Sequence, residues 1–421
     1  MKKKLEILIL DDNDDSGRAN EQRIRSACEL SSIEVNVSYI EEGRKSALIG
    51  AIDKMGSEDA WNDPEAFIGS LDDLKHVDVL FIDYQLKTLK NHAWLTAENV
   101  AGWIRAYSDI PVIGILNRFF DVDFDLSMLL GTSATSADFH VNDRLLTLPA
   151  LWTEATGDTP TKDSFHPWQW PMIPRVVEDV AACRADLEQV DLSSEILPFF
   201  GFSEQDVEQL TRHALGYLDP TSVSPANATF LQFLKEGRLA TPKELRLALS
   251  NALEEQAAPK RDELRRVVAR ILTSELRRWL SNLVLLTQDV LIDAPHLANR
   301  MPWVLQESNN LEKRRLLVTS RYKEAFAAQV EPYTFQAERW LSRPAFWVAK
   351  IQKDDAIDDL YRDYETPEDE QVFLEDFSCF VGSAVAEPFQ PAFDSVWPTR
   401  YVYGEAVSGW GYKYAPKVRL I

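Results

Sequence analysis

The feature that most constrains the fold is an alternation of short apolar runs with amphipathic stretches over the first 145 residues. Several of these runs are apolar at consecutive positions, as are parallel strands that are buried on both faces. We predict five strands, at Leu5–Leu10, Ile33–Ile40, Val77–Ile82, Pro111–Leu116 and Ala137–Val141. We predict helices between them, over 15–29, 42–56, 96–106 and roughly 123–131. This order predicts an α/β doubly wound parallel five-stranded sheet, with functional groups at the carboxyl ends of its strands.

Helix signals dominate the rest of the chain. A helix is predicted over 174–190, and none of the 16 glycines falls between Gly237 and Gly382. Apolar residues recur at helical spacing from Leu264 to Val284, which predicts one long amphipathic helix.

The last residues differ again, because 400–403 and 412–414 are β-prone and predict a short terminal hairpin or strands. We therefore expect two domains. An α/β domain would span 1–190, and a larger, mainly α-helical module with a short β-containing C-terminal tail would span 191–421.

Composition narrows the function classes. The 67 Asp and Glu outnumber the 45 Lys and Arg, which gives a net charge of −22 and disfavours broad binding to nucleic acids or anionic membranes. Glu6 and Asp11 interrupt the first apolar run, so it does not predict a signal peptide, and no later run is long enough to span a membrane. The three cysteines lie far apart and do not predict a disulfide framework. We expect a cytoplasmic protein.

Three carboxylates follow two of the predicted strands. Asp11 and Asp12 come directly after the first strand, and Asp83 follows the third. Because the carboxyl ends of neighbouring parallel strands meet at one edge of a sheet, we expect the three side chains to converge. Such a cluster repels itself unless protonation or a hard divalent cation neutralises it. The three carboxylates are therefore a candidate site for a hard divalent cation.

At these residues the chain resembles a known family. The runs Leu8–Asp12 and Leu80–Asp83 resemble the receiver domain of two-component response regulators. Ile110–Leu116 and Ser136–Val141 match that family's fourth and fifth strands in outline. The resemblance covers about the first 145 residues. It implies that Asp11, Asp12 and Asp83 hold Mg²⁺ and that Asp83 is the phosphoacceptor for a histidine kinase.

Two positions depart from the family pattern. The hydroxyl residue that ends the family's fourth strand is replaced by Leu116, and the lysine that follows its fifth strand is replaced by Asn142. Asp143 stands beside Asn142 and would add a negative charge near a phosphorylated Asp83. The sequence therefore predicts an atypical, pseudo-receiver domain without normal phosphorylation switching.

A basic segment offers a second candidate contact. Residues 260–323 hold 13 Lys and Arg against 7 Asp and Glu, so they sum to +6 in a chain whose remainder sums to −28. On the predicted long helix, Arg266, Arg270 and Arg277 lie on one side and form a basic stripe. The stripe would contact an anion or a partner, or pair with acidic groups inside the protein or across an interface. We favour the pairing.

A histidine and an aromatic run are weaker candidates for a functional site. His296 follows Asp293 at a spacing that suits a general base, but the neighbouring residues supply no nucleophile, and we expect no catalysis there. Trp168 and Trp170 lie in an aromatic run for which core packing or partner anchoring is favoured over a ligand pocket.

The leading hypothesis is a signalling protein in which an atypical receiver-like domain regulates or docks a C-terminal protein-interaction module. Its partner would be a protein, with a histidine-kinase-like ATPase as the candidate, and we expect neither nucleic-acid binding nor enzyme activity. Whether it forms an oligomer stays open. The alternative is a stress or phage-defence effector whose C-terminal region is an unfamiliar enzyme acting on nucleic acid or nucleotides.

Overall fold

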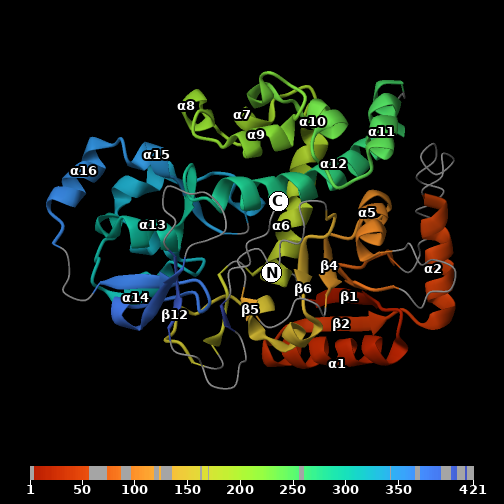
Figure 1. Ribbon diagram of the computed structural model, residues 1–421, viewed down its shortest axis with the longest axis horizontal. Helices are drawn as coiled ribbons and strands as arrows, with labels where there is room; N and C mark the ends of the chain where they lie inside the picture. The colour runs from red at the N-terminus through yellow and green to blue at the C-terminus, as the bar shows by residue number, and fades with distance from the viewer. Residues whose placement is uncertain are drawn as a thin grey trace.

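Five parallel strands form the central sheet of the N-terminal half of the computed structural model (Figure 1). They pair in the order β2-β1-β3-β4-β6 and confirm all five predicted strands, with both ends within two residues of the predicted ones. Their bounds are β1 (Lys4–Leu10), β2 (Glu34–Tyr39), β3 (Val79–Asp83), β4 (Val112–Leu116) and β6 (Phe139–Val141). The structure describes residues 4–55, 74–86, 96–117, 123–124, 135–161, 164–168, 170–255, 260–341, 343–365, 370–389, 400–404 and 413–414.

Helices cover both faces of this sheet. The apolar side chains of β1 point alternately to the two faces of the sheet and enter two separate cores. Leu5, Ile7 and Ile9 face α1, while Leu8 and Leu10 face α2 and α5. The bounds of these helices, and of α6 beyond the sheet, are α1 (Asp14–Leu30), α2 (Glu42–Met55), α5 (Ala97–Tyr107) and α6 (Ile173–Gln189). The four predicted helices at these places are therefore confirmed.

One predicted helix is wrong where it can be compared. Asp123 and Phe124 form a strand, β5 (Asp123–Phe124), and pair in parallel with β13 (Lys413–Tyr414) near the C-terminus. The remaining residues of the helix predicted over roughly 123–131 lie outside the described residues. A strand partner nearly 300 residues away decided the local conformation at Asp123 and Phe124, and no local pattern carries that information.

The second half of the chain is mainly helical, with small sheets. Its helices are α7 (Ile196–Phe199), α8 (Glu204–Val207), α9 (Arg212–Leu218), α10 (Phe230–Glu236), α11 (Lys243–Glu255), α12 (Lys260–Trp279), a π-helical continuation (Leu280–Leu285), α13 (Ala294–Arg300), α14 (Leu311–Leu316), α15 (Val348–Ile351) and α16 (Asp355–Arg362). Short 3₁₀ helices along the chain are Asp143–Thr147, Pro149–Leu151, Pro225–Asn227, Pro302–Val304, Tyr322–Ala325, Ala328–Tyr333, Glu338–Trp340 and Ser383–Val385. Thus α12 and its continuation are the predicted long helix.

Both β-prone runs near the end of the chain form strands, as predicted, but they do not pair with each other as a terminal hairpin. β12 pairs with β9 and β11 in a four-stranded sheet, order β10-β9-β12-β11, whereas β13 pairs with β5. β7 and β8 form a separate antiparallel pair. The bounds are β7 (Leu291–Asp293), β8 (Ala345–Trp347), β9 (Gln371–Leu374), β10 (Cys379–Gly382), β11 (Ala386–Phe389) and β12 (Arg400–Tyr403).

The two halves share their hydrophobic cores. α6 ends at Gln189, beside the domain boundary predicted near 190, and α12 packs against both α6 and α5 (Figure 1). The core on that side of the sheet continues from Ile104 through Leu187 to Leu272 and Leu276. On the opposite side, Leu374 of β9 lies in the same core as the N-terminal strands. Within the described residues, no helix is long and apolar enough to cross a membrane.

Candidate functional site

The structure brings the three predicted carboxylates together at the carboxyl edge of the central sheet. β1 and β3 pair in parallel with Leu10 opposite Ile82, so the residues that end these strands are neighbours. One oxygen each from Asp11, Asp12 and Asp83 lies within 4.8 Å of the other two. Asp11 is buried at 2 % exposure, and the other two side chains are half-buried. Three like charges therefore face a common point that solvent can reach.

The chain around this edge is held by the start of α1. The Asn13 side chain accepts hydrogen bonds from the backbone of Asp15 and Ser16, at 2.9 and 3.1 Å, and so caps the helix. The backbone N–H of Asn13 in turn donates to Asp11 Oδ1 at 2.9 Å. This chain of bonds fixes the Asp11 carboxylate relative to α1, so its position at the edge is set by local sequence.

The donor set of the cluster fits a hard divalent cation. Carboxylate oxygens are the ligands that Mg²⁺ takes from proteins, and Mg²⁺ usually keeps several waters beside one or two carboxylates. Oxygens bound to one octahedral Mg²⁺ at about 2.1 Å lie no more than about 4.2 Å apart. The three carboxylate oxygens, up to 4.8 Å apart, could therefore bind such an ion after a small side-chain movement, or one of them could bind it through a water. Asp11, Asp12 and Asp83 are the residues that would hold it.

The position opposite Asp83 carries no hydroxyl group. The register of β3 and β4 places Leu116 directly beside Asp83, and the Leu116 side chain is buried at 1 % exposure. Where the family resemblance requires a hydroxyl group that contacts a phosphoryl group, this chain therefore has an aliphatic side chain packed into the core.

At the other departing position, Asn142 has a structural role. It follows β6 and its side-chain oxygen accepts from the backbone of Arg144 at 3.0 Å, which caps the next 3₁₀ helix. Asp143 pairs with Arg23 of α1 at 2.8 Å. The negative charge predicted from Asp143 is therefore balanced within the protein. The interpretation that this residue repels a phosphoryl group was wrong in that respect, while the absence of a lysine at Asn142 stands.

The three arginines of the basic stripe have different surroundings. Arg270 is buried, donates to Asp109 at 2.6 Å and donates to the Ala106 carbonyl at 3.0 Å, both near the end of α5. Arg277 donates to the backbone carbonyl of Arg339. Arg266 is exposed. Arg270 thus pairs with an acidic group of the same chain, as the favoured interpretation expects, whereas Arg277 joins α12 to another segment through a backbone carbonyl.

A buried charge network surrounds His296, and only part of it is visible in the sequence. Asp293 caps α13 and its Oδ1 lies 2.5 Å from His296 Nδ1, which the three-residue spacing indicates. Glu375 contacts the other ring nitrogen, and Arg400 donates to Glu375 at 2.7 Å. Arg400 also donates to the Leu286 carbonyl at 2.6 Å. Glu375 and Arg400 come from β9–β10 and β12, and no spacing rule links them to His296.

The network favours the charged form of His296. Burial alone would lower the pKa of His296, but Asp293 and Glu375 raise it above its usual value. Burial alone would likewise raise the pKa of Glu375, but His296 and Arg400 lower it to about 2. With a carboxylate on each ring nitrogen, the imidazolium cannot accept a proton from a substrate. The network therefore stabilises the fold and does not supply the general base considered from the sequence.

Comparisons with models of protein families, with curated proteins and with solved structures found no match for this chain. The interpretation of its function consequently depends on the arrangement of its own residues.

Proposed function

We propose that this chain is a cytoplasmic signalling protein in which an atypical receiver-like domain binds Mg²⁺ and regulates or docks the C-terminal module without normal phosphorylation switching. The observation that carries the proposal is the edge formed by Asp11, Asp12 and Asp83 in a sheet of order β2-β1-β3-β4-β6, with Leu116 beside Asp83. The acids supply a cation site, and the neighbouring strand lacks the hydroxyl group that would sense a phosphoryl group.

The packing of α12 supports regulation within the chain. α12 contacts α5 and α6, and Arg278 at its end donates to the Ala137 carbonyl, two residues before β6, at 3.3 Å. The Arg270–Asp109 ion pair ties the same helix to the end of α5. If a change at the carboxyl edge of the sheet shifts α5 or the segment before β6, α12 is the element that would carry it to the C-terminal module, because α12 contacts both.

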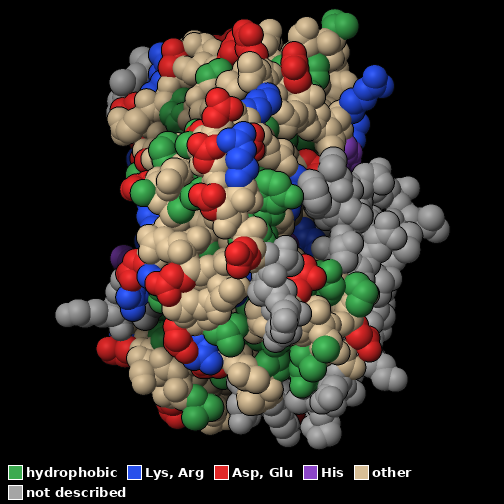
Figure 2. Space-filling model, turned by 90° about the vertical axis from the view of Figure 1, so that its left-hand side faces the viewer, with side chains coloured by type: hydrophobic (Ala, Val, Ile, Leu, Met, Phe, Trp, Pro, Cys, Tyr) green, Lys and Arg blue, Asp and Glu red, His purple; other side chains and the backbone are tan. Residues whose placement is uncertain are grey.

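Surface charge supports a protein partner over a nucleic acid. On the face shown in Figure 2, Lys and Arg side chains are scattered among Asp and Glu, and the described side chains there form no continuous basic surface. Arg270 is committed to internal contacts. With a net charge of −22, the electrostatic term that dominates nucleic-acid binding is unfavourable over most of the chain. The partner we propose is a protein, with a histidine-kinase-like ATPase as the candidate.

A phosphodonor experiment tests the proposal. The full chain is incubated with acetyl phosphate and Mg²⁺, the adduct on Asp83 is followed by intact-mass spectrometry, and amide hydrogen exchange is measured in α12. We expect no durable adduct and unchanged exchange, because Leu116 and Asn142 provide neither the hydroxyl group nor the ammonium group that would stabilise it.

A rebuilt variant supplies the positive control. Leu116→Thr combined with Asn142→Lys restores both groups, and it should form a longer-lived adduct than the natural chain, while Asp83→Asn in the same background should abolish it. A durable adduct on Asp83 of the natural chain that alters exchange in α12 would contradict the proposal.

A further inference from the structure

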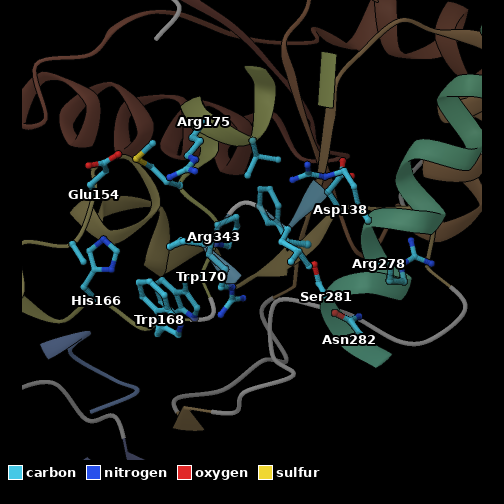
Figure 3. Close-up of a pocket in the computed structure, with 18 of the residues that line it drawn as sticks. Asp138, Glu154, His166, Trp168, Trp170, Arg175, Arg278, Ser281, Asn282 and Arg343 are labelled. Carbon is cyan, nitrogen blue, oxygen red and sulfur yellow. The ribbon is translucent and has the colours of Figure 1, made fainter. Parts of the chain in front are cut away.

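A pocket of about 150 Å³ lies where the two halves of the chain meet (Figure 3). Its wall combines Ala137–Phe139 at β6, the end of α12 with its π-helical continuation, and residues 154–155, 166, 168, 170–172, 175–176, 318–319, 341 and 343–344. The site is separate from the acidic edge, none of whose three aspartates lines it.

The wall of the pocket is basic in an otherwise acidic protein. Arg175, Arg277, Arg278 and Arg343 line it, against Asp138 and Glu154. Asp138 is engaged by Arg105 at 2.5 Å, and Glu154 is exposed. Arg278 pairs with Glu275 at 3.2 Å and Arg175 with Asp179 at 3.6 Å, so two of the four arginines already have a carboxylate beside them. Four guanidinium groups in one wall still favour an anion as the occupant, because each carries several hydrogen-bond donors.

Aromatic rings form another part of the wall, and their N–H groups make no hydrogen bond within the described residues. Trp168 and Trp170 lie side by side at one end of the pocket (Figure 3), and Arg343 lies 5.6 Å from the Trp168 ring centre. Among the residues that the structure describes, neither indole N–H has a hydrogen-bond acceptor, although both atoms are buried. The Ser274 hydroxyl, which can donate, and the Asn282 side-chain oxygen, which accepts, also lie in the wall and have no hydrogen-bond partner among the described residues. Buried polar atoms without a partner are rare in folded proteins and indicate an absent ligand or water.

Arg343 connects the wall of the pocket with the charge network around His296. Burial lowers the pKa of Arg343, and the carboxylates of Asp293 and Glu375 oppose this effect.

We propose that this pocket binds a small organic anion, consisting of a planar apolar body and one carboxylate or phosphate group. The indole rings and the apolar side chains Phe139, Val176 and Leu341 would pack on the body, and the arginines and indole N–H groups would bind the anionic group. The size follows from the volume, because a cavity of about 150 Å³ accommodates one benzene ring. A nucleotide would need a larger site.

Calorimetric titration of the full chain tests this site. The probes are benzoate and phenyl phosphate, with inorganic phosphate as the probe that lacks a ring. We expect one of the two ring-bearing anions to bind with 1:1 stoichiometry and at least about tenfold more tightly than inorganic phosphate, which corresponds to ~1.4 kcal/mol. Equal binding of inorganic phosphate, or no binding of either ring-bearing probe tighter than about 1 mM, would overturn the proposal.

Matched variants locate the binding. Arg277→Gln removes a charge from the wall and should weaken binding about tenfold, whereas Arg266→Gln makes the same change on an exposed part of α12 and should leave it unaltered. Trp170→Phe keeps an aromatic ring but removes the buried N–H, so it should weaken binding. Its melting temperature is measured separately, because the smaller ring also reduces packing in the core. If Arg277→Gln does not fold, Arg175→Gln, also in the wall, replaces it. Equal effects of the pocket and α12 surface variants would contradict the assignment.

Discussion

The acidic edge of the central sheet and the buried network around His296 differ in the charges that they combine. Asp11, Asp12 and Asp83 bring three charges of one sign to a half-buried edge. The network combines carboxylates with His296 and Arg400 in the interior, where each charge has an oppositely charged partner within hydrogen-bonding distance. A cluster of one sign gains from an external cation, whereas the carboxylates of the network already face cationic groups. We therefore propose the edge, and not the network, as the place for a cation.

The largest effect should come from breaking the mixed cluster. Arg400→Met removes the partner of Glu375 and leaves a buried carboxylate, which should reduce the free energy of unfolding by about 3–5 kcal/mol. Arg362→Met, at an exposed position on α16, is the matched control and should leave the unfolding free energy unchanged. Chemical denaturation measures both. A loss of less than about 1 kcal/mol in Arg400→Met would show that the network is not tightly coupled.

A smaller loss is expected where a buried arginine faces an exposed acid. Arg270→Glu places a carboxylate against Asp109 and also removes the bond to the Ala106 carbonyl, which should cost about 2–3 kcal/mol of unfolding free energy. The same reversal at the exposed Arg266 should leave stability and folding unchanged. Equal melting temperatures for the two variants would contradict the role of Arg270 in joining α12 to α5.

The pH dependence of stability distinguishes the two regions further. The pKa of His296 is raised in the folded state, so its contribution to stability is fully present below the unfolded pKa of about 6.5 and is lost as pH rises through the folded value. The natural chain should therefore lose unfolding free energy over that range, by no more than about 1.4 kcal/mol per pH unit from this group. His296→Gln should flatten the profile, whereas His213→Gln, at an exposed position, should preserve it. An identical slope in the two variants would show that His296 does not carry the effect.

The sequence predicts the acidic edge well because its determinants are local. Asp11 and Asp12 follow β1, Asp83 ends β3, and the parallel pairing of these two strands brings their ends together. Hydrophobic periodicity identifies the same strands because each is buried on both faces.

The network and the pairing of the C-terminal strands could not be predicted from the sequence, since the residues that determine them lie far apart in the chain. Glu375 and Arg400 reach His296 from 79 and 104 residues away, and β12 pairs with β9 instead of turning back onto β13. Periodicity within a short window contains no information about such contacts, because tertiary pairing selects among strands of similar propensity. The pocket between the halves depends on the same long-range packing, so Trp168 and Trp170 could not be assigned to it from sequence.

Magnesium titration tests the central claim most directly. The melting temperature of the natural chain, of Asp12→Asn and of Asp15→Asn is measured against Mg²⁺ concentration at neutral pH and constant ionic strength. Asp15 lies in the first turn of α1, is exposed and is not part of the cluster, so its variant controls for general charge. We predict that Mg²⁺ at about ten times its dissociation constant stabilises the natural chain and Asp15→Asn by about 1.4 kcal/mol, and Asp12→Asn by much less. Equal stabilisation of all three proteins would contradict the cation site, and with it the proposed receiver-like function.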